Sequence, residues 1–179
     1  MKRILAVMLM LLILEPPAAV FAGQGKDAAM PDETKSKVEA ALKNLQAELQ
    51  NQIPEDEGGI AEALKNYLGK YPQIYGAAFA YAPVEKAGKS SYKAFYIYRK
   101  GKEGLVRKDM EPGRDFTQDE WYAVGAQRRE GGWSKPYYDT FGAGPDVLMT
   151  TYSLPVFETG GRLLGVVTSD VLIQDKDPS

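Results

Sequence analysis

The sequence predicts an α+β fold, with helices at the N-terminal side and an antiparallel sheet after them. Between residues 32 and 71, apolar side chains recur every three or four positions, which is the period of an amphipathic helix. After Pro72 the period changes to two, as in half-buried strands. Short turns join the later segments, so we expect antiparallel strands with the helices segregated from them.

Two helices are expected ahead of Pro72, which stops the second. Asp32 is placed to cap the first helix, and Pro54 with the acidic run after it ends that helix. The pair Gly58-Gly59 then completes the turn. The apolar stripe of the first helix is Val38, Leu42, Leu45 and Leu49, and that of the second is Ile60, Leu64, Tyr67, Leu68 and Tyr71.

The strands are recognised by alternation and by the turn residues that bound them. The last two form a hairpin that turns at Thr159-Gly160-Gly161. The expected strands are residues 74–81, 92–98, 105–107, 147–157 and 163–173.

A third helix is expected between the strands. Thr117 is placed as its N-cap, and Glu120 completes a capping box. Trp121 and Tyr122 then fall in the first turn of this helix. Residues 131–139, with the sequence GGWSKPYYD, show neither period and read as a loop.

The first residues have the pattern of a secretory signal peptide. Two basic residues precede an apolar run from Ile4 to Leu14, and small residues end at Ala22. The run is shorter than the ~20 residues that a spanning helix needs, and an uncleaved anchor is the alternative. We expect a periplasmic or secreted protein with a signal peptide over residues 1–22, a disordered lead-in over 23–31, one domain over 32–175 and a tail over 176–179.

Composition excludes several kinds of site. The chain has no cysteine and no histidine, which removes disulfides, thiol catalysis and the commonest general base. The formal net charge is −2, and loss of Lys2, Arg3 and Glu15 with the signal peptide makes it −3. A net charge this close to zero does not predict a basic surface that would bind nucleic acid or an anionic membrane. No cofactor or metal ion is expected.

An aspartate interrupts the most hydrophobic strand. Asp170 lies in LLGVVTSDVLI, residues 163–173, and alternation places it on one face with Leu164, Val166, Thr168 and Leu172. A buried carboxylate loses hydration worth several kcal/mol unless hydrogen bonds or a cation replace it. Asp170 is therefore either a structural residue, bonded to backbone amides or to an arginine, or a ligand anchor at the floor of a pocket.

Aromatic residues gather beside a second acid. Trp121 and Tyr122 come from the third helix, and Trp133, Tyr137 and Asp139 from the stretch GGWSKPYYD. Aromatic faces attract cations, and a carboxylate beside them completes a cage for an ammonium group. In the alternative, Trp133 and Tyr137 only staple the loop to the sheet, since buried Trp and Tyr are common core residues.

Four short motifs occur in order between Asp119 and Ile173: WY, W-x-x-P-Y-x-D, T-x-S-x-P-V and G-x-x-x-G-V-V-x-x-D. Upstream of them stand a long helix, then LKNYLGKYPQIYGAAFAYAP and YIYRKG. In this order the features closely resemble the Cache family of extracellular sensor modules, also called PDC domains. The resemblance covers nearly all of the mature chain.

The resemblance implies a PAS-like central antiparallel sheet with long N-terminal helices and a pocket on one face. Such modules bind amino acids, amines and organic acids, and they sit on chemoreceptors, histidine kinases or cyclic-dinucleotide enzymes. In amino-acid-binding members the two acids and the tyrosine hold the ammonium end. The positions that line the pocket there match Trp121, Tyr122, Tyr137, Asp139 and Asp170.

Two positions depart from those members. They carry an arginine two residues before the Trp-Tyr pair, where it grips the ligand carboxylate, and this chain has Asp119 there. They also carry a tyrosine about where Arg114 stands. This favours an amine or a quaternary ammonium, or an amino acid if Arg114 replaces the missing arginine. Members also continue into a second module or a membrane helix, so a free-standing module is expected of a chain that stops at Ser179.

The leading hypothesis is an extracytoplasmic sensor module that signals through a separate membrane receptor or kinase. The alternatives are a structural or interaction protein with a non-functional pocket, and a hydrolase that uses Asp139 and Asp170 as an acid pair. The hydrolase is disfavoured because the chain lacks His, Cys and a G-x-S-x-G elbow. The stripe of the first helix fits either packing on the chain's own sheet or a homodimer.

Overall fold

The computed structural model of the chain describes residues 30–173 except 53, 55, 87, 140, 141 and 143–146. The expected signal peptide and tail lie outside the described residues, as does the lead-in up to residue 29. Met30, within the expected lead-in, packs against the hydrophobic core. The elements in order are α1 (Asp32–Asn51), α2 (Glu57–Lys70), β1 (Gly76–Tyr81), β2 (Val84–Lys86), β3 (Lys89–Ser91), β4 (Ala94–Arg99), a 3₁₀ turn (Gly101–Glu103), β5 (Leu105–Asp109), α3 (Glu120–Gln127), β6 (Gly132–Trp133), β7 (Tyr137–Tyr138), β8 (Leu148–Phe157) and β9 (Leu163–Leu172).

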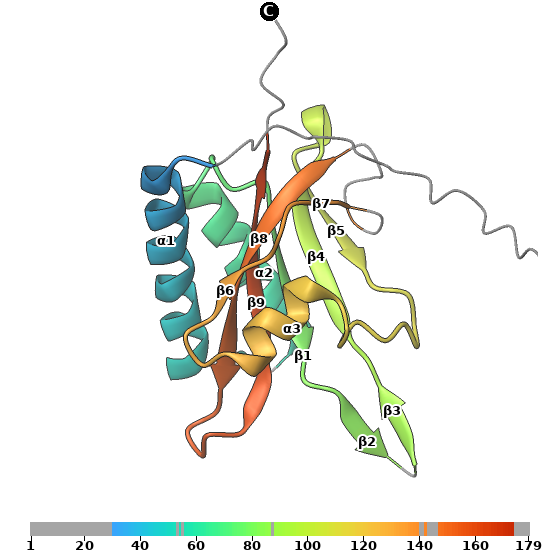
Figure 1. Cartoon of the computed structure of the whole chain (residues 1–179). Helices are drawn as coiled ribbons and strands as arrows, with labels where there is room; N and C mark the ends of the chain where they lie inside the picture. The colour runs from blue at the N-terminus through green and yellow to red at the C-terminus, as the bar shows by residue number, and fades with distance from the viewer. Residues whose placement is uncertain are drawn as a thin grey trace, which may run out of the picture.

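One antiparallel sheet organises the domain (Figure 1). Its strand order is β5-β4-β1-β9-β8-β6, and β7 also pairs with β8. In Figure 1 α3 lies in front of the sheet and α2 behind it. This arrangement confirms the predicted α+β class, with a central antiparallel sheet and two N-terminal helices. The expected strands are all present, and the short β2–β3 hairpin is an addition that the sequence did not predict.

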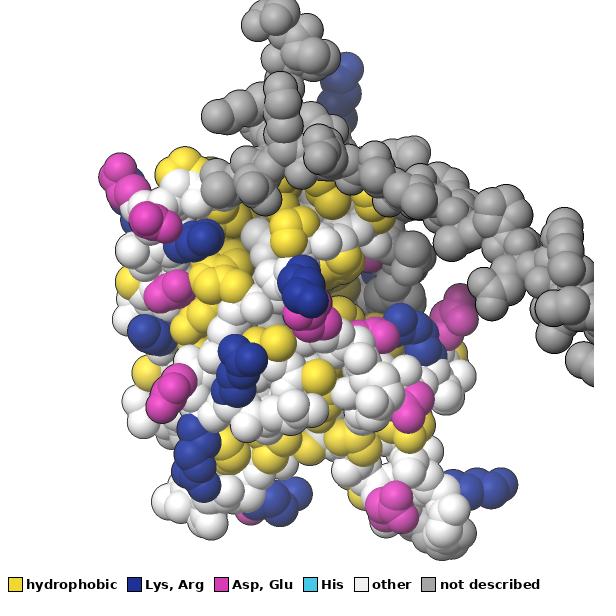
Figure 2. Space-filling view, in the orientation of Figure 1, with side chains coloured by type: hydrophobic (Ala, Val, Ile, Leu, Met, Phe, Trp, Pro, Cys, Tyr) yellow, Lys and Arg dark blue, Asp and Glu magenta, His cyan; other side chains and the backbone are white. Residues whose placement is uncertain are grey.

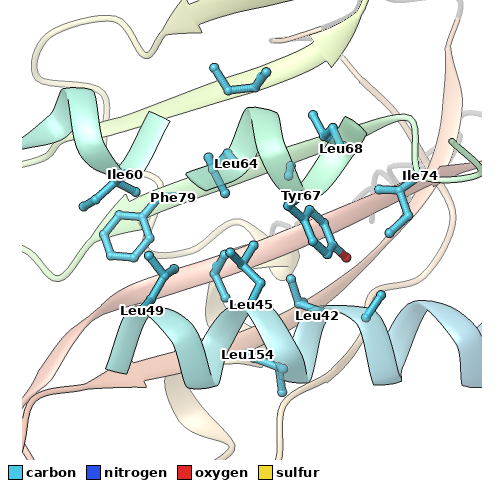
Figure 3. Packing of buried hydrophobic residues seen from close by; sticks show 14 of the residues in the cluster. Leu42, Leu45, Leu49, Ile60, Leu64, Tyr67, Leu68, Ile74, Phe79 and Leu154 are labelled. Carbon is cyan, nitrogen blue, oxygen red and sulfur yellow. The ribbon is translucent and has the colours of Figure 1, made fainter. Parts of the chain in front are cut away.

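The side of the sheet that faces α1 and α2, called the helix side below, holds the main core (Figure 3). Leu42, Leu45 and Leu49 of α1 come together with the apolar face of α2 and with strand residues. Burying each such leucine stabilises the fold by about 1.5–3 kcal/mol. The predicted stripe of α1 is confirmed, and it packs on the chain's own sheet. That of α2 is confirmed except for Tyr71, which follows the helix and is only partly buried.

The ends of α2 differ in part from the expectation. Gly58 and Gly59 lie in its first turn instead of in a preceding turn, and the Asp56 carboxylate caps the helix by accepting from the Gly59 amide at 2.8 Å. At the other end, Arg99 of β4 donates to the carbonyls of Leu68, Tyr71 and Ile74. Asp32 is likewise the first residue of α1 and not its cap.

The start of α3 also corrects the sequence prediction. Thr117 is not the N-cap, because its amide and hydroxyl both donate to Asp115 Oδ1, at 2.8 and 2.6 Å. This local turn competes with a capping box, and the helix begins three residues later at Glu120. Trp121 and Tyr122 are in its first turn, as expected.

Residues 131–139 form a broken edge strand and not a loop. The two pieces, β6 and β7, both pair with β8, and Pro136 lies in the break between them. Proline cannot donate to a ladder, so it suits an interrupted edge. Gly131 leads in with φ +73°, where an added Cβ would also overlap the Ser153 carbonyl. The edge strand thereby reaches the pocket at one end and the helix layer at the other.

Candidate ligand pocket

A cavity of about 260 Å³ lies on the α3 side of the sheet. Its size is at the small end of ligand pockets, which suits a molecule of amino-acid size. Strands β1, β4, β7, β8 and β9 supply its floor and walls, together with the segment that leads into α3. The described lining residues are Ala78, Ala94, Phe95, Tyr96, Met110, Arg114, Asp119, Glu120, Trp121, Tyr137, Asp139, Gly142, Met149, Thr151, Thr168 and Asp170.

Asp170 lies on the pocket floor, where it is 4% exposed. Thr151 is its partner across the β8–β9 ladder and donates to Asp170 Oδ1 at 2.7 Å. The Tyr137 hydroxyl lies 2.8 Å from the same Thr151 oxygen. Among the described residues, no lysine or arginine forms an ion pair with Asp170. Within the part of the chain that the structure describes, Asp170 is therefore not paired with an arginine, as one of the two structural roles required.

The face that Asp170 shares agrees with the predicted alternation in part. Val166, Thr168 and Asp170 are buried on the pocket side of β9, and the last two line the cavity. Leu164 differs, because it packs against the helix-side core. It stands beside a register irregularity at Val156 and Phe157, and an irregular register interrupts simple alternation.

The environment of Asp170 disfavours its ionised form. Burial is the main cause, and the nearby Asp139 acts in the same direction, so that the pKa of Asp170 rises from 3.8 to about 7. The Thr151 hydroxyl and the nearby Tyr96 hydroxyl oppose this rise. Near neutral pH a larger fraction of Asp170 is therefore protonated than of an exposed aspartate.

Asp139 follows β7 directly and is 7% exposed. Its Oδ1 accepts from the Gly142 amide at 2.8 Å, and Gly142 also lines the pocket. An added Cβ at Gly142 would overlap the Tyr96 ring and crowd Asp139 Oδ2. The sequence thus brings two carboxyl groups, Asp139 and Asp170, to one small cavity, as expected from their motifs.

Tyr96 is a pocket residue that sequence reasoning missed. It is 6% exposed, and its hydroxyl makes no hydrogen bond of normal geometry within the described part of the chain. Its ring stacks on Tyr98 at 5.1 Å, and Gly76 leaves room for the hydroxyl, since a Cβ there would overlap it. Alternation placed Tyr96 on a strand, but nothing in the sequence marked it among eleven tyrosines.

Arg114 and Asp119 both line the pocket and pair with each other. Arg114 Nη2 lies 2.8 Å from Asp119 Oδ2, and Trp121 Nε1 donates to the same oxygen at 3.1 Å. Arg114 Nη1 points to the Met110 sulfur at 3.5 Å. Asp119 thus holds both the guanidinium and the indole that form one wall.

The structure does not bring Tyr122 or Trp133 to the pocket. Tyr122 is 3% exposed and packs in a separate core cluster with Phe116 and Val166. Trp133 lies on the helix side, where its Nε1 donates to Glu39 of α1 at 2.8 Å and its ring packs on Tyr152 at 5.1 Å. The staple alternative therefore describes Trp133, while Trp121 and Tyr137 line the cavity.

Three other features of the molecule bear on its function: the surface charge on the α3 side, possible metal ligands and possible membrane-spanning helices. On the face that carries α3, basic and acidic side chains are interspersed (Figure 2). Within residues 30–173, apart from the positions not described, there is no group of three side chains that could hold a metal ion. No helix among the described residues has the length and hydropathy to cross a membrane.

Comparison with solved structures shows the same fold in sensor domains. The extracellular domain described as that of histidine kinase soHK1S-Z6 is 24% identical with a TM-score of 0.64, over 78% of this chain and 54% of that one. The ligand-binding domain of the Campylobacter jejuni chemoreceptor Tlp3, in complex with L-valine, is 16% identical with a TM-score of 0.59, over 79% and 53%. The chain therefore spans about half the length of these structures.

The family is shown by a match along the sequence. No curated protein sequence matches the chain. Residues 60–175, more than half of the chain, match the model of the methyl-accepting chemotaxis protein-like first PDC sensor domain. The fold, the pocket on the α3 side of the sheet and this match agree, and the chain belongs to that family of PDC sensor domains.

Proposed function

We propose that the chain is an extracytoplasmic sensor module that binds a small molecule through a cationic amino group, as an amine, a quaternary ammonium or an amino acid. One observation carries the proposal: Asp139 and Asp170, both more than nine-tenths buried, line the same cavity of about 260 Å³. A cation bound there replaces the hydration that burial removes from the carboxylates.

The other walls support a cationic ligand. Trp121 and Tyr137 contribute aromatic surface beside the acids, and such surfaces attract ammonium groups by about 0.5–2 kcal/mol. The one cation among the described lining residues, Arg114, pairs with Asp119. The Tlp3 domain, whose structures hold L-valine, L-norvaline or isoleucine, has the same fold.

The output of the module is proposed to lie in another protein. Structures of this fold include extracellular domains of histidine kinases and a chemoreceptor domain, so a membrane receptor or kinase is the kind of partner we propose. The basic and apolar residues at positions 1–14 support export. Mass spectrometry of exported protein should find Gly23 at the N-terminus, and protein that retains Met1 would contradict cleavage.

A thermal-shift screen followed by calorimetry tests the binding proposal. Amines, amino acids and quaternary ammonium compounds should raise the melting temperature, because they bind the folded state only. Organic acids without an amino group should not. Stabilisation by organic acids alone would contradict the cationic site. Silence across the panel would favour the structural alternative, and turnover of a hit would reveal an enzyme.

A further inference from the structure

We infer that the pocket selects amines that carry no α-carboxylate, and that Asp119 sets this selectivity. The inference rests on the proposed binding of a cationic amino group and narrows its ligand class. Four acidic residues line the described cavity: Asp119, Glu120, Asp139 and Asp170. Against them stands a single basic residue, Arg114, among the described lining residues. The described lining is thus negative, and it repels a carboxylate on the ligand.

The pairing of Arg114 removes the natural partner of a ligand carboxylate. Its Nη2 is 2.8 Å from Asp119 Oδ2, and its Nη1 is directed to the Met110 sulfur. A ligand carboxylate at Arg114 would compete with Asp119 for the guanidinium and would lie beside the Asp119 carboxylate. Like charges in contact are unfavourable, and the displaced Asp119 would also give up its bond from Trp121 Nε1.

The two sides of the pocket therefore read different parts of the ligand. Asp139 and Asp170 offer buried acceptors for an ammonium group. In the wall of Arg114, Asp119 and Trp121, the guanidinium Nη2 and the indole Nε1 both lie against one oxygen of the Asp119 carboxylate. Asp119 thus balances the positive charge of Arg114, and the Trp121 ring and Met110 offer apolar surface to the rest of the ligand.

Pairs of compounds that differ only by the carboxylate test this inference on the full chain after export. They are isobutylamine with L-valine, isoamylamine with L-leucine, and phenethylamine with L-phenylalanine. Calorimetry at pH 8 should find the amine bound at least about tenfold more tightly than its amino acid in a pair that binds, which is about 1.4 kcal/mol. Asp119→Asn should raise the amino acid's affinity and narrow this ratio about tenfold. Glu111→Gln removes an exposed charge from the same segment outside the pocket and should leave the ratio unchanged.

The outcomes separate this inference from the proposed function. Equal or tighter binding of the amino acids by the unmodified protein overturns the inference and leaves the cationic site standing. An unchanged ratio in folded Asp119→Asn protein overturns the role of Asp119. Failure of every amine and every amino acid to bind overturns both. The comparison within the unmodified protein holds whether or not the variant folds.

Discussion

Thr151 and Asp170 face each other across the β8–β9 ladder, and the Thr151 hydroxyl donates to Asp170 Oδ1 at 2.7 Å. A hydroxyl has one hydrogen to give. When Asp170 is ionised, the Thr151 hydroxyl donates its hydrogen to the carboxylate. The Tyr137 hydroxyl, 2.8 Å from the Thr151 oxygen, must then donate to Thr151. The charge of Asp170 thereby fixes the orientation of two hydroxyl groups in the pocket wall.

Asp170→Asn should stabilise the empty protein at pH 8. The pKa of Asp170 in the fold, about 7, lies above its ordinary value of 3.8, so the folded state holds the proton more tightly. The carboxyl therefore destabilises the fold as pH rises from about 4 to 7, and the loss is complete above that range. The upper limit of the effect is about 4 kcal/mol. Urea unfolding of both proteins at pH 4, 6 and 8 measures it.

The gain from Asp170→Asn should be mostly gone at pH 4, just above the ordinary pKa of 3.8, and should disappear at still lower pH, where the side chain is protonated in both states. Asp115→Asn supplies a contrast, because bonds from Thr117 lower the pKa of the exposed Asp115. Its removal should destabilise at pH 8 and not at low pH. A large loss of stability in Asp170→Asn at pH 8 would identify Asp170 as structural.

Binding of an amine should release protons and tighten as pH rises. The amine is cationic throughout, whereas about a tenth of Asp170 is ionised at pH 6 if its pKa is about 7. Asp170 interacts electrostatically with one other carboxyl group and with four tyrosines, which are Asp139, Tyr96, Tyr137, Tyr75 and Tyr67. Affinity should rise about tenfold between pH 6 and pH 8. Calorimetry in buffers of different ionisation enthalpy counts the released protons.

The same titration on Asp170→Asn should lose most of this pH dependence along with affinity. Dependence that survives the substitution would assign the titrating group elsewhere.

Trp121→Ala and Trp133→Ala should have different consequences. Trp121 lines the pocket, and its loss should weaken amine binding more than tenfold, since an aromatic face over a desolvated cation is worth ~2 kcal/mol. Trp133 ties β6 to Glu39 of α1, so its loss should destabilise by about 1–3 kcal/mol and spare affinity. Equal affinity losses in the two folded variants would refute this assignment.

Tyr96→Phe should leave the empty fold at least as stable. The Tyr96 hydroxyl is buried near Asp170 but lacks a hydrogen bond of normal geometry in the described structure, and an unsatisfied buried hydroxyl costs about 1–3 kcal/mol. The hydroxyl also lowers the pKa of Asp170, so its removal should move that pKa upward. Carboxyl NMR of Asp170 follows the titration directly. A downward move would show that Tyr96 does not stabilise the carboxylate.

Sequence patterns predicted the helices, the β8–β9 hairpin and Asp170, because each has a clear period or breaks one. They could not separate Trp133 from Tyr137. Four residues apart on an unbroken strand, the two would share a face. In the structure Trp133 opposes Tyr152 and Tyr137 opposes Met149, so β6 and β7 differ in register by one residue. A slip of one residue sends a side chain to the other face, and only the tertiary pairing reveals it.

Tyr122 and Tyr96 illustrate two further limits of the sequence. Tyr122 follows Trp121 on a helix, where neighbours do not share a face, and its side chain fills a cluster around Phe116. Tyr96 depends on space left by Gly76 and Gly142, which are distant along the chain. Contacts of this kind arise from packing, and no local pattern encodes them.

Successive residues of β9 belong to different layers. Asp170 lines the pocket, while the hydroxyl of Ser169 lies 2.6 Å from that of Tyr67 on α2. A single peptide bond separates the two side chains, and planar peptide bonds resist twisting. The residue that faces the ligand pocket and the residue that contacts α2 are therefore neighbours in one strand, so a shift of the Asp170 backbone would act directly on the Tyr67 contact.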